Sequence, residues 1–373
     1  MVKKNKLRIF GDIILLIITL VFAVFLIRSI FSSLIASTQP FISSIGQLEA
    51  DTNNYVLRPA EPGSLYDGLD FDQYIEGQYT VLGLGMDEDG LNTDVMMLFI
   101  FDINAAKINI LQIPRDSYVG PEFTNSEVGK INSVYSQGTA SGSGINKVVK
   151  CVRDLVQIPI DSYIAIKCTD VAPVVDAMGG IPMNVPDDII YEHDKIIKKG
   201  EHVLTGEQSE WFVRYRHDYL EGDIGRMKAQ RFFLAAAFQK VQSLGTLKIL
   251  SIYPTLQEYI MSDLTMDEIG MLCDFAQTVT MDNVMARMIP GEEISPGEIN
   301  EQYGWSLHKQ ETADILNEFF RPYQEDVDAD ALKIPEVKNT VSYYENDGDN
   351  FGDIIAGEVD AVTKREDANS LLD

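Results

Sequence analysis

The chain has 373 residues, enough for one large domain or two with an ample hydrophobic core. Its 45% hydrophobic and 23% charged residues are typical of a folded protein. The formal net charge of −27 argues against a broad nucleic-acid surface, because no basic stripe is present that could neutralise several phosphates. The cysteines, Cys151, Cys168 and Cys273, lie far apart without metal-ligand spacing and predict no disulfide framework.

A single membrane anchor is predicted at the N-terminus. Four basic residues among the first eight precede residues 13–27, where only Thr19 is polar. Extended to residue 35, the run has about 23 residues, enough to cross ~30 Å of hydrocarbon. The basic residues before it predict a cytoplasmic N-terminus and an extracytoplasmic remainder. A cleaved signal peptide is the alternative, but the run is long for one and no A-x-A site follows closely. We therefore expect residues 1–35 to be a cytoplasmic stub and transmembrane anchor.

The next segment, residues 36–75, contains several prolines and glycines without sustained periodicity and predicts an extracytoplasmic stalk. A folded domain is expected over residues 76–322. It opens with a buried-type strand at 79–84. Strands at 96–101 and 108–113 follow, and their short polar connection predicts a hairpin.

Strands and helices alternate through the rest of this domain. Further strands are expected at 163–166, 181–185 and 284–289, and helices at 145–155, 171–178, 228–244, twice within 247–278, and at 308–320. This alternation predicts an α/β fold with a central mixed β-sheet covered by helices on both faces.

The composition changes near the C-terminus. Residues 325–373 contain 14 acidic and 4 basic residues and few apolar ones. Residues 323–373 are therefore predicted to be a disordered acidic tail. Five residues in it have the spacing of an EF-hand-like calcium loop, although Phe351 occupies one ligand position and the flanks are poor helices. These residues are Asp347, Asp349, Gly352, Ile354 and Glu358.

The basic stretch at residues 211–231 carries candidate phosphate ligands. Arg214 and Arg216 are two residues apart, so on a strand both side chains would point to one face. The bend that follows predicts a helix start with Asp223 as the N-cap and Arg226 three residues later. Strand end, turn and helix start would direct three guanidinium groups at one anion, usually phosphate. The alternative is a solvated basic face with ordinary salt bridges.

Two acidic residues form a candidate metal site. Asp87 follows the first strand and Asp94 begins the second, so one loop joins them and they could share a divalent cation. Carboxylate oxygens suit Mg²⁺, which also binds substrate phosphate. The alternative is that both are turn residues whose side chains accept hydrogen bonds from loop amides.

Further polar candidates lie at the ends of predicted elements, where function tends to sit. Pro114 stops the third strand and fixes the direction of Arg115. Lys130, in a later loop, is either another phosphate ligand or a surface charge. Gln230 lies one turn after Arg226 on the same helix face.

Four ordered motifs span most of residues 77–240. They are LGLGMDEDGLNTDVMMLFIFD, INILQIPRDSYV with KINSVYSQG after it, YIAIKCTDVAPVVDAMGGIPMNVPDDI, and LTGEQSEWFVRYRHDYLEGDIGRMKAQRFFL. With these motifs the chain resembles the LytR-CpsA-Psr family of cell-wall glycopolymer transferases. It follows that family's layout, including a MIPGE segment, to about residue 322. The predicted anchor with an extracytoplasmic domain fits as well.

The resemblance implies an enzyme of a Gram-positive-type cell envelope that moves a glycopolymer, such as teichoic acid or capsule, from a polyprenyl pyrophosphate carrier to a peptidoglycan hydroxyl. The lipid tail would lie in an apolar groove inside the domain. By motif position, Asp87 and Asp94 would hold Mg²⁺, or Mn²⁺ in its place. The resemblance implies that Arg115, Arg214, Arg216 and Arg226 clamp phosphate oxygens in catalysis, with Asp223 and Gln230 supporting them or contacting the head group. Lys130, Asp116 and Asp218 are further candidates for substrate contacts from their positions in the loops. The family usually has a basic residue where this chain has Asn92.

Several alternatives stay open at this point. Phosphoryl transfer needs a carboxylate that accepts the proton of the attacking hydroxyl, and Asp116, Asp218 and Asp223 are all candidates. The same site could hydrolyse polyprenyl pyrophosphate with water as the nucleophile. A non-catalytic wall-binding or regulatory module is the third reading.

Overall fold

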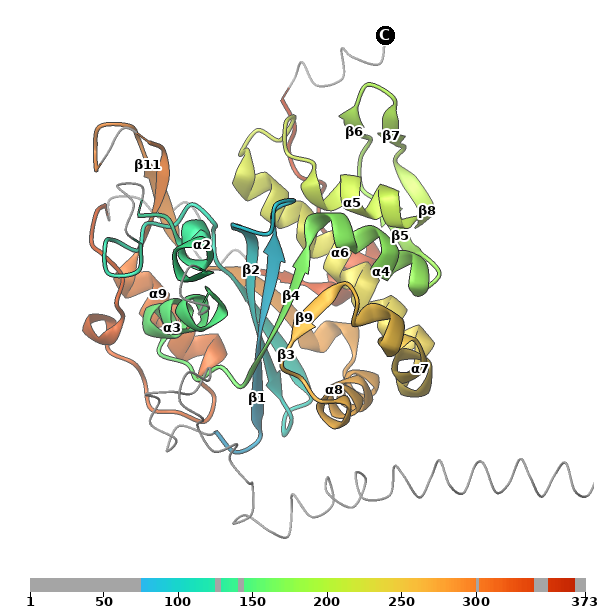
Figure 1. Cartoon of the computed structure of the whole chain (residues 1–373), viewed down its shortest axis with the longest axis horizontal. Helices are drawn as coiled ribbons and strands as arrows, with labels where there is room; N and C mark the ends of the chain where they lie inside the picture. Colours follow the sequence, from blue (N-terminus) through green and yellow to red (C-terminus); the bar gives the residue numbers. More distant parts are fainter. Residues whose placement is uncertain (1–74, 125–128, 140–143, 300–301, 339–347, 366–373) are drawn as a thin grey trace, which may run out of the picture. The chain divides into compact units, whose positions relative to one another are not determined.

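The computed structural model describes residues 75–365, except 125–128, 140–143, 300–301 and 339–347 (Figure 1). The chain divides into two compact units, residues 1–59 and 60–373, and every described residue belongs to the second unit. The predicted anchor and nearly all of the predicted stalk lie outside the described residues and stay predictions. Among the helices that the structure describes, none has both the length and the apolar character needed to cross a bilayer.

A seven-stranded mixed sheet forms the centre of the second unit, in the order β13-β10-β3-β2-β1-β4-β9. The first three strands form an antiparallel meander, with β4 parallel to β1 and β10 parallel to β3. The short edge strands β9 and β13 are antiparallel to their neighbours. The predicted mixed sheet is therefore confirmed. Its strands are β1 (Gln78–Met86), β2 (Thr93–Asp102), β3 (Lys107–Gln112), β4 (Ser162–Lys167), β9 (Ile260–Ser262), β10 (Val284–Met288) and β13 (Gly348–Asn350).

The described helices are α2 (Val134–Thr139), α3 (Gly144–Val156), α4 (Val171–Ala177), α5 (Gly206–Arg214), α6 (Asp223–Leu244), α7 (Thr246–Leu256), α8 (Met266–Thr278), α9 (Lys309–Ile315) and α10 (Phe351–Ala356). Two-stranded sheets pair β5 (Ile181–Val185) with β8 (Gly200–Leu204), β6 (Ile189–Glu192) with β7 (Lys195–Ile197), and β11 (Gly291–Ile294) with β12 (Gly304–Leu307).

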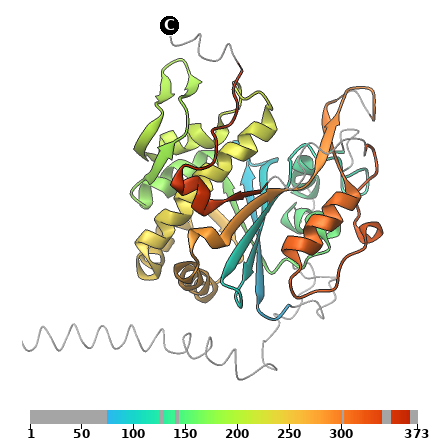
Figure 2. The same ribbon diagram turned by 180° about the vertical axis from the view of Figure 1, so that it is seen from behind.

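Alternating side chains of the central strands build two cores, one on each face of the sheet. On β2, Met96, Leu98 and Ile100 belong to the first core. Met97 belongs to the second and Phe99 packs against it, because successive strand residues face opposite sides. Helices α2, α3 and α9 cover the first core, and α4, α5, α6, α8 and α10 cover the second (Figure 1, Figure 2). Helices thus cover both faces, as predicted.

The segment that carries Arg214 and Arg216 differs from the prediction. A capping box at Thr205 starts α5, and the helix continues to Arg214, so Arg214 is helical and Arg216 lies in the turn after it. The two side chains therefore do not share a strand face. Helix α6 has Gly222, with φ of 56°, as its N-cap, which makes Asp223 the first helical residue rather than the cap. A carboxylate in this first turn still interacts favourably with the helix dipole.

The C-terminal residues are folded where the structure describes them. Leu332 is buried in the first core, and Phe351 and Ile354 of α10 are buried in the second. Figure 2 shows α10, in red, against α6. The prediction of a disordered tail is therefore wrong for residues 323–338 and 348–365. The described part of the predicted calcium loop also differs from the prediction, because Asp349 pairs with Arg231 and a helix begins at Phe351, whereas Asp347 lies outside the described residues.

Candidate active site

The candidate site lies at one edge of the central sheet. Strands β1 and β3 run in the same direction, since both are antiparallel to β2, and both end at this edge. The β1–β2 loop contains Asp87, and the segment after β3 contains Arg115. The start of α6 lies at the same edge, because Arg226 Nη2 donates to the carbonyl oxygen of Asp94, near the start of β2, at 3.0 Å. Ligands of open α/β sheets commonly bind at the carboxyl ends of strands.

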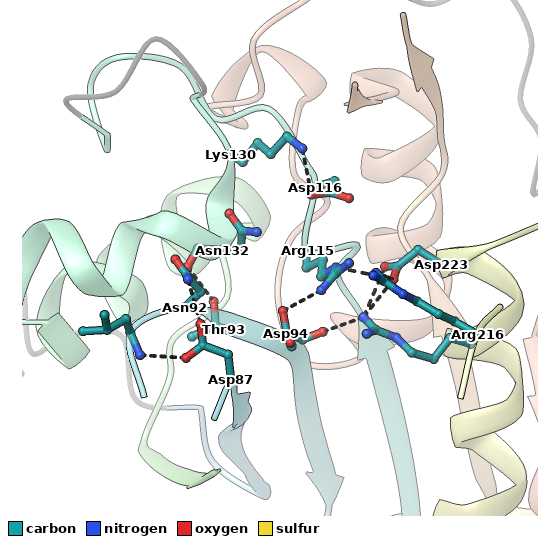
Figure 3. A network of polar contacts seen from close by, with 12 residues as sticks. Asp87, Asn92, Thr93, Asp94, Arg115, Asp116, Lys130, Asn132, Arg216 and Asp223 are labelled. Carbon is teal, nitrogen blue, oxygen red and sulfur yellow. Dashed lines mark hydrogen bonds and ion pairs between the residues drawn. The ribbon is translucent and has the colours of Figure 1, made fainter. Parts of the chain in front are cut away.

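Three arginines converge on the Asp223 carboxylate. Its Oδ1 atom lies 3.0 Å from Arg226 Nη2 and 3.4 Å from Arg115 Nε. Arg216 Nη1 lies 3.8 Å from the same oxygen. Figure 3 shows Arg115 and Arg216 approaching Asp223 from opposite sides. Three cations face the carboxylates of Asp223 and Asp94, so the cluster carries one excess positive charge in a strongly acidic protein.

Burial makes this cluster electrostatically unusual. Arg226 is only 5% exposed, and its burial, together with nearby Arg115, lowers the pKa of Arg226 despite the attraction of Asp223. Burial also acts to lower the pKa of Arg115, but the carboxylates of Asp223 and Asp94 outweigh it and raise that pKa. Arg115 Nε, Arg226 Nε and Asp223 Oδ1 are buried without a well-oriented hydrogen bond. Buried polar atoms left in this way favour an incoming ligand that can pair with them.

Arg214 has a different set of partners. Its Nη1 lies 2.6 Å from Glu210 Oε1 on the same helix, and its Nη2 lies 4.0 Å from Glu88 Oε2 in the β1–β2 loop. The guanidinium group also lies over the Tyr191 ring, 5.8 Å from its centre. Arg214 therefore lies near the loop of the candidate site but outside the cluster on Asp223.

Of the two predicted metal ligands, Asp87 lies in the β1–β2 loop and Asp94 near the start of β2, and each already has partners. Asp87 accepts hydrogen bonds from Leu91 N at 2.8 Å and from Asn92 Nδ2 at 2.7 Å. Burial acts to raise the pKa of Asp87, but these hydrogen bonds outweigh it and lower that pKa, so the side chain is ionised at neutral pH. Asp94 Oδ1 lies 2.7 Å from Arg115 Nη1 (Figure 3).

The remaining predicted residues fall into separate contacts. Asp116 Oδ1 lies 3.0 Å from Lys130 Nζ, in the segment next to Arg115 (Figure 3). Asp218 accepts a short hydrogen bond from the hydroxyl of buried Tyr215. Gln230 is 5% exposed and donates from Nε2 to the Val213 carbonyl at 3.0 Å, so it fixes the end of α5.

One supporting contact was not predicted from the sequence. Arg231, 1% exposed, donates from Nε to Gln112 Oε1 at 2.7 Å, and Gln112 Nε2 donates to the Met227 carbonyl at 3.1 Å. This bridge joins the end of β3, just before Arg115, to α6. A polar residue in the apolar run of β3 was the available signal, because buried amides require partners.

The sequence profile of the LytR_cpsA_psr family matches residues 50–321, which contain all of these site residues. The chain belongs to this family. The resemblance seen in its motifs is thereby confirmed.

Two relatives of this chain carry transferase names. It is 31% identical over 200 residues to TagU of Oceanobacillus iheyensis and 29% identical over 220 residues to TagV of Bacillus subtilis. Both are named polyisoprenyl-teichoic acid–peptidoglycan teichoic acid transferases. The matches cover 52% and 57% of this chain and 61% and 55% of the relatives, so the chain spans less than two thirds of their length.

Solved structures of the family share the fold. The crystal structure of Bacillus subtilis TagV aligns with a TM-score of 0.53 and 27% identity, covering 61% of this chain and 90% of TagV. A structure titled TagT bound to LI-WTA aligns with a TM-score of 0.54 and 24% identity, covering 65% of this chain and 89% of TagT. At that identity the second likeness concerns the fold alone.

Proposed function

We propose that this protein transfers a glycopolymer from a polyprenyl pyrophosphate carrier to a peptidoglycan hydroxyl outside the membrane. The observation that carries the proposal is the convergence of Arg115, Arg216 and Arg226 on one carboxylate at the edge of the sheet. Membership of the family and the transferase names of its relatives support it. The anchor predicted at residues 1–35 would hold this site near lipid-linked substrates.

A pyrophosphate group suits the arginine cluster chemically. Guanidinium groups present planar sets of donors that match phosphate oxygens. The buried Nε atoms of Arg115 and Arg226 are donors that such oxygens could satisfy. In phosphoryl transfer, positioned cations stabilise the charge that develops on the leaving group, here a polyprenyl phosphate. Asp223 would then exchange part of its contact with the arginines for the ligand.

We propose Mg²⁺, or Mn²⁺ in its place, as the cofactor, held by Asp87 and Asp94. The donor chemistry fits, because both are carboxylates, one in the β1–β2 loop and one at the start of β2, and the pKa of Asp87 is held low. Among the described residues no group of three or more His, Cys, Asp or Glu side chains is arranged to hold a metal ion, so further ligands would be phosphate and water, as is usual for Mg²⁺. A bound ion supplies charge neutralisation at the phosphoryl oxygens.

Apolar side chains that pack against the second core are proposed to receive the polyprenyl tail. Several side chains that pack against the second core are only partly buried, although they are large and apolar. Gly83 allows the Phe99 ring to lie over β1, since a Cβ atom there would be 2.7 Å from Phe99 Cε2. Ordinary core packing is the alternative role of these side chains. They include Val95, Phe99 and Phe101 on β2 and Phe233, Leu234 and Phe238 on α6.

The acceptor hydroxyl requires a proton acceptor, and the contacts narrow the choice. The Asp218 carboxylate already accepts the hydrogen bond of the Tyr215 hydroxyl. Asp116, next to Arg115 and paired with Lys130, and Asp223 are the remaining candidates.

A transfer assay tests the proposal. The 373-residue chain would be incubated with a labelled polyprenyl-pyrophosphate glycan, with Mg²⁺, and with or without peptidoglycan. We expect label on peptidoglycan and release of polyprenyl phosphate only when the acceptor is present. Release of polyprenyl phosphate and soluble glycan phosphate at the same rate without acceptor would indicate a hydrolase, and no turnover in either case would indicate a binding module.

A further inference from the structure

The family profile ends at residue 321, yet a later part of the chain lies against the candidate site. We call residues 348–365 the C-terminal segment. It contributes β13, α10 and an extended stretch after α10. Some contacts of this segment reach α6 and the loop between α5 and α6, which carry Arg226 and Arg216.

The first anchor of the C-terminal segment is an ion pair. Asp349 Oδ2 on β13 lies 2.8 Å from Nη1 of buried Arg231. Arg231 in turn holds Gln112, which is bonded to the carbonyl of Met227. Because Gln112 is three residues before Arg115 and Met227 follows Arg226, the contact fixes both sides of the arginine cluster.

The second anchor lies on the loop between α5 and α6, which carries Arg216. Leu220 N donates to the Thr363 carbonyl at 3.0 Å, and Arg365 N donates to the Asp218 carbonyl at 2.8 Å. Tyr219 and Lys364 form an antiparallel bridge between these two bonds. The C-terminal segment thus adds a short strand-like pairing to this loop.

The Lys364 side chain strengthens this anchor. It is 9% exposed, with Nζ 3.3 Å from Asp187 Oδ2 and donating a short hydrogen bond to the Asp188 carbonyl. The ammonium group also lies 5.3 Å from the centre of the Tyr215 ring. A buried lysine with these partners connects the turn before β6 to the residue that precedes Arg216. Removing its charge leaves Asp187 and the Tyr215 ring without this contact.

We propose that the C-terminal segment positions the arginine cluster, with Lys364 as a positioning residue for Arg216 and Asp349 as one for Arg115 and Arg226. The inference rests on the proposed function, because its ligand is the pyrophosphate group of that reaction. The cations of the cluster repel one another, so holding them within reach of one anion requires support from surrounding structure. Here, part of that support comes from outside the family domain.

The test compares Lys364→Met with Lys364→Arg and with the matched control Lys198→Met. Lys198 pairs with Asp188 Oδ2 at 3.0 Å from an exposed position and has no contact with the α5–α6 loop. Binding of inorganic pyrophosphate, KM and kcat for the lipid-linked glycan, and Tm would be measured on the whole chain. We expect Lys364→Met to raise the pyrophosphate Kd and the KM about tenfold, with kcat changed by no more than about twofold. Lys364→Arg should restore most of the affinity, because it keeps the positive charge. Lys198→Met should match the wild type.

If Lys364→Met does not fold, a chain shortened to end at residue 358 replaces it in the test, because this chain lacks Lys364 but keeps β13 and α10. It should show the same loss of pyrophosphate affinity. Wild-type Kd in the folded Lys364→Met protein, or in the shortened chain, overturns the inference and leaves the proposed function intact. A wild-type chain that binds no pyrophosphate and turns over no lipid-linked glycan overturns both.

Discussion

Arg115 Nη1 lies 2.7 Å from Asp94 Oδ1, so a guanidinium group proposed to bind phosphate is paired with a carboxylate proposed to bind metal. The same arginine reaches Asp223 through Nε at 3.4 Å. Acidic side chains therefore neutralise Arg115 in the absence of substrate. When pyrophosphate and Mg²⁺ bind, the phosphate oxygens would replace Asp94 as the partner of Arg115, and Mg²⁺ would replace Arg115 as the partner of Asp94. The charges in this partly buried site would then stay balanced.

The arginines should differ in importance. We expect Arg115→Lys and Arg226→Lys to lower kcat/KM for transfer by about 10²-fold, because lysine cannot reproduce the planar donor set. Arg214→Lys should cost at most about fivefold, since its partners are Glu210, Glu88 and the Tyr191 ring rather than Asp223. Initial rates of glycan transfer measure this. Equal losses in all three variants would contradict the separation of Arg214 from the cluster.

Asp223→Asn should destabilise the free protein and make it more responsive to anions. Removing the carboxylate leaves three arginines with little compensation, and we expect the free energy of unfolding to fall by about 1–3 kcal/mol. Pyrophosphate should then raise Tm more in the variant than in the wild type, because the ligand supplies the missing charge. Thermal unfolding with and without pyrophosphate measures both effects. A variant as stable as the wild type, or indifferent to pyrophosphate, would count against this role of Asp223.

Metal dependence should change when either acidic ligand is neutralised. Asp87→Asn and Asp94→Asn should each raise the Mg²⁺ concentration for half-maximal transfer by at least about tenfold. Asn92→Ala is the control, because it removes one hydrogen bond to Asp87 and keeps the charge. Rates would be measured against Mg²⁺ after treatment with a chelator. Full wild-type activity in excess chelator would exclude the proposed cofactor.

Asp161, far from the arginine cluster in sequence, should make stability depend on pH. Burial raises its pKa from 3.8 to about 6, against hydrogen bonds from Thr80 N and Oγ1, both at 2.7 Å. Between these values the folded state binds a proton that the unfolded state has lost. The free energy of unfolding therefore falls as pH rises from about 4 to 6, by up to about 3 kcal/mol from this group.

Asp161→Asn should remove this contribution. Urea unfolding at several pH values, taken as the difference from wild type, would show the variant gaining relative stability as pH rises from 4 to 6. Asp330→Asn is the control, since that side chain is 94% exposed. A difference between Asp161→Asn and wild type that stays constant with pH would refute the assignment.

The sequence was sufficient for the features that depend on local pattern. Short apolar runs predicted β1, β2 and β3, and the spacing of apolar residues predicted most of the helices that cover them, because burial restricts which positions are apolar. The four motifs led to the family, and the basic stretch named Arg214, Arg216 and Arg226 as one group, with Asp223 at the helix start beside them. Each of these depends on residues close in the chain.

Only the tertiary structure decided which of these groups meet. Arg214 and Arg216 look equivalent by spacing, but a helix in place of a strand rotates Arg214 toward Glu210. Acidic composition predicted disorder at the C-terminus, yet a few apolar side chains such as Phe351, together with the pairing of Asp349 and Arg231, hold it on the sheet. The acidic composition of the C-terminal residues describes their average character, whereas their burial depends on single contacts with residues more than a hundred positions away. Those contacts follow from strand order and packing, which spacing along the chain does not contain.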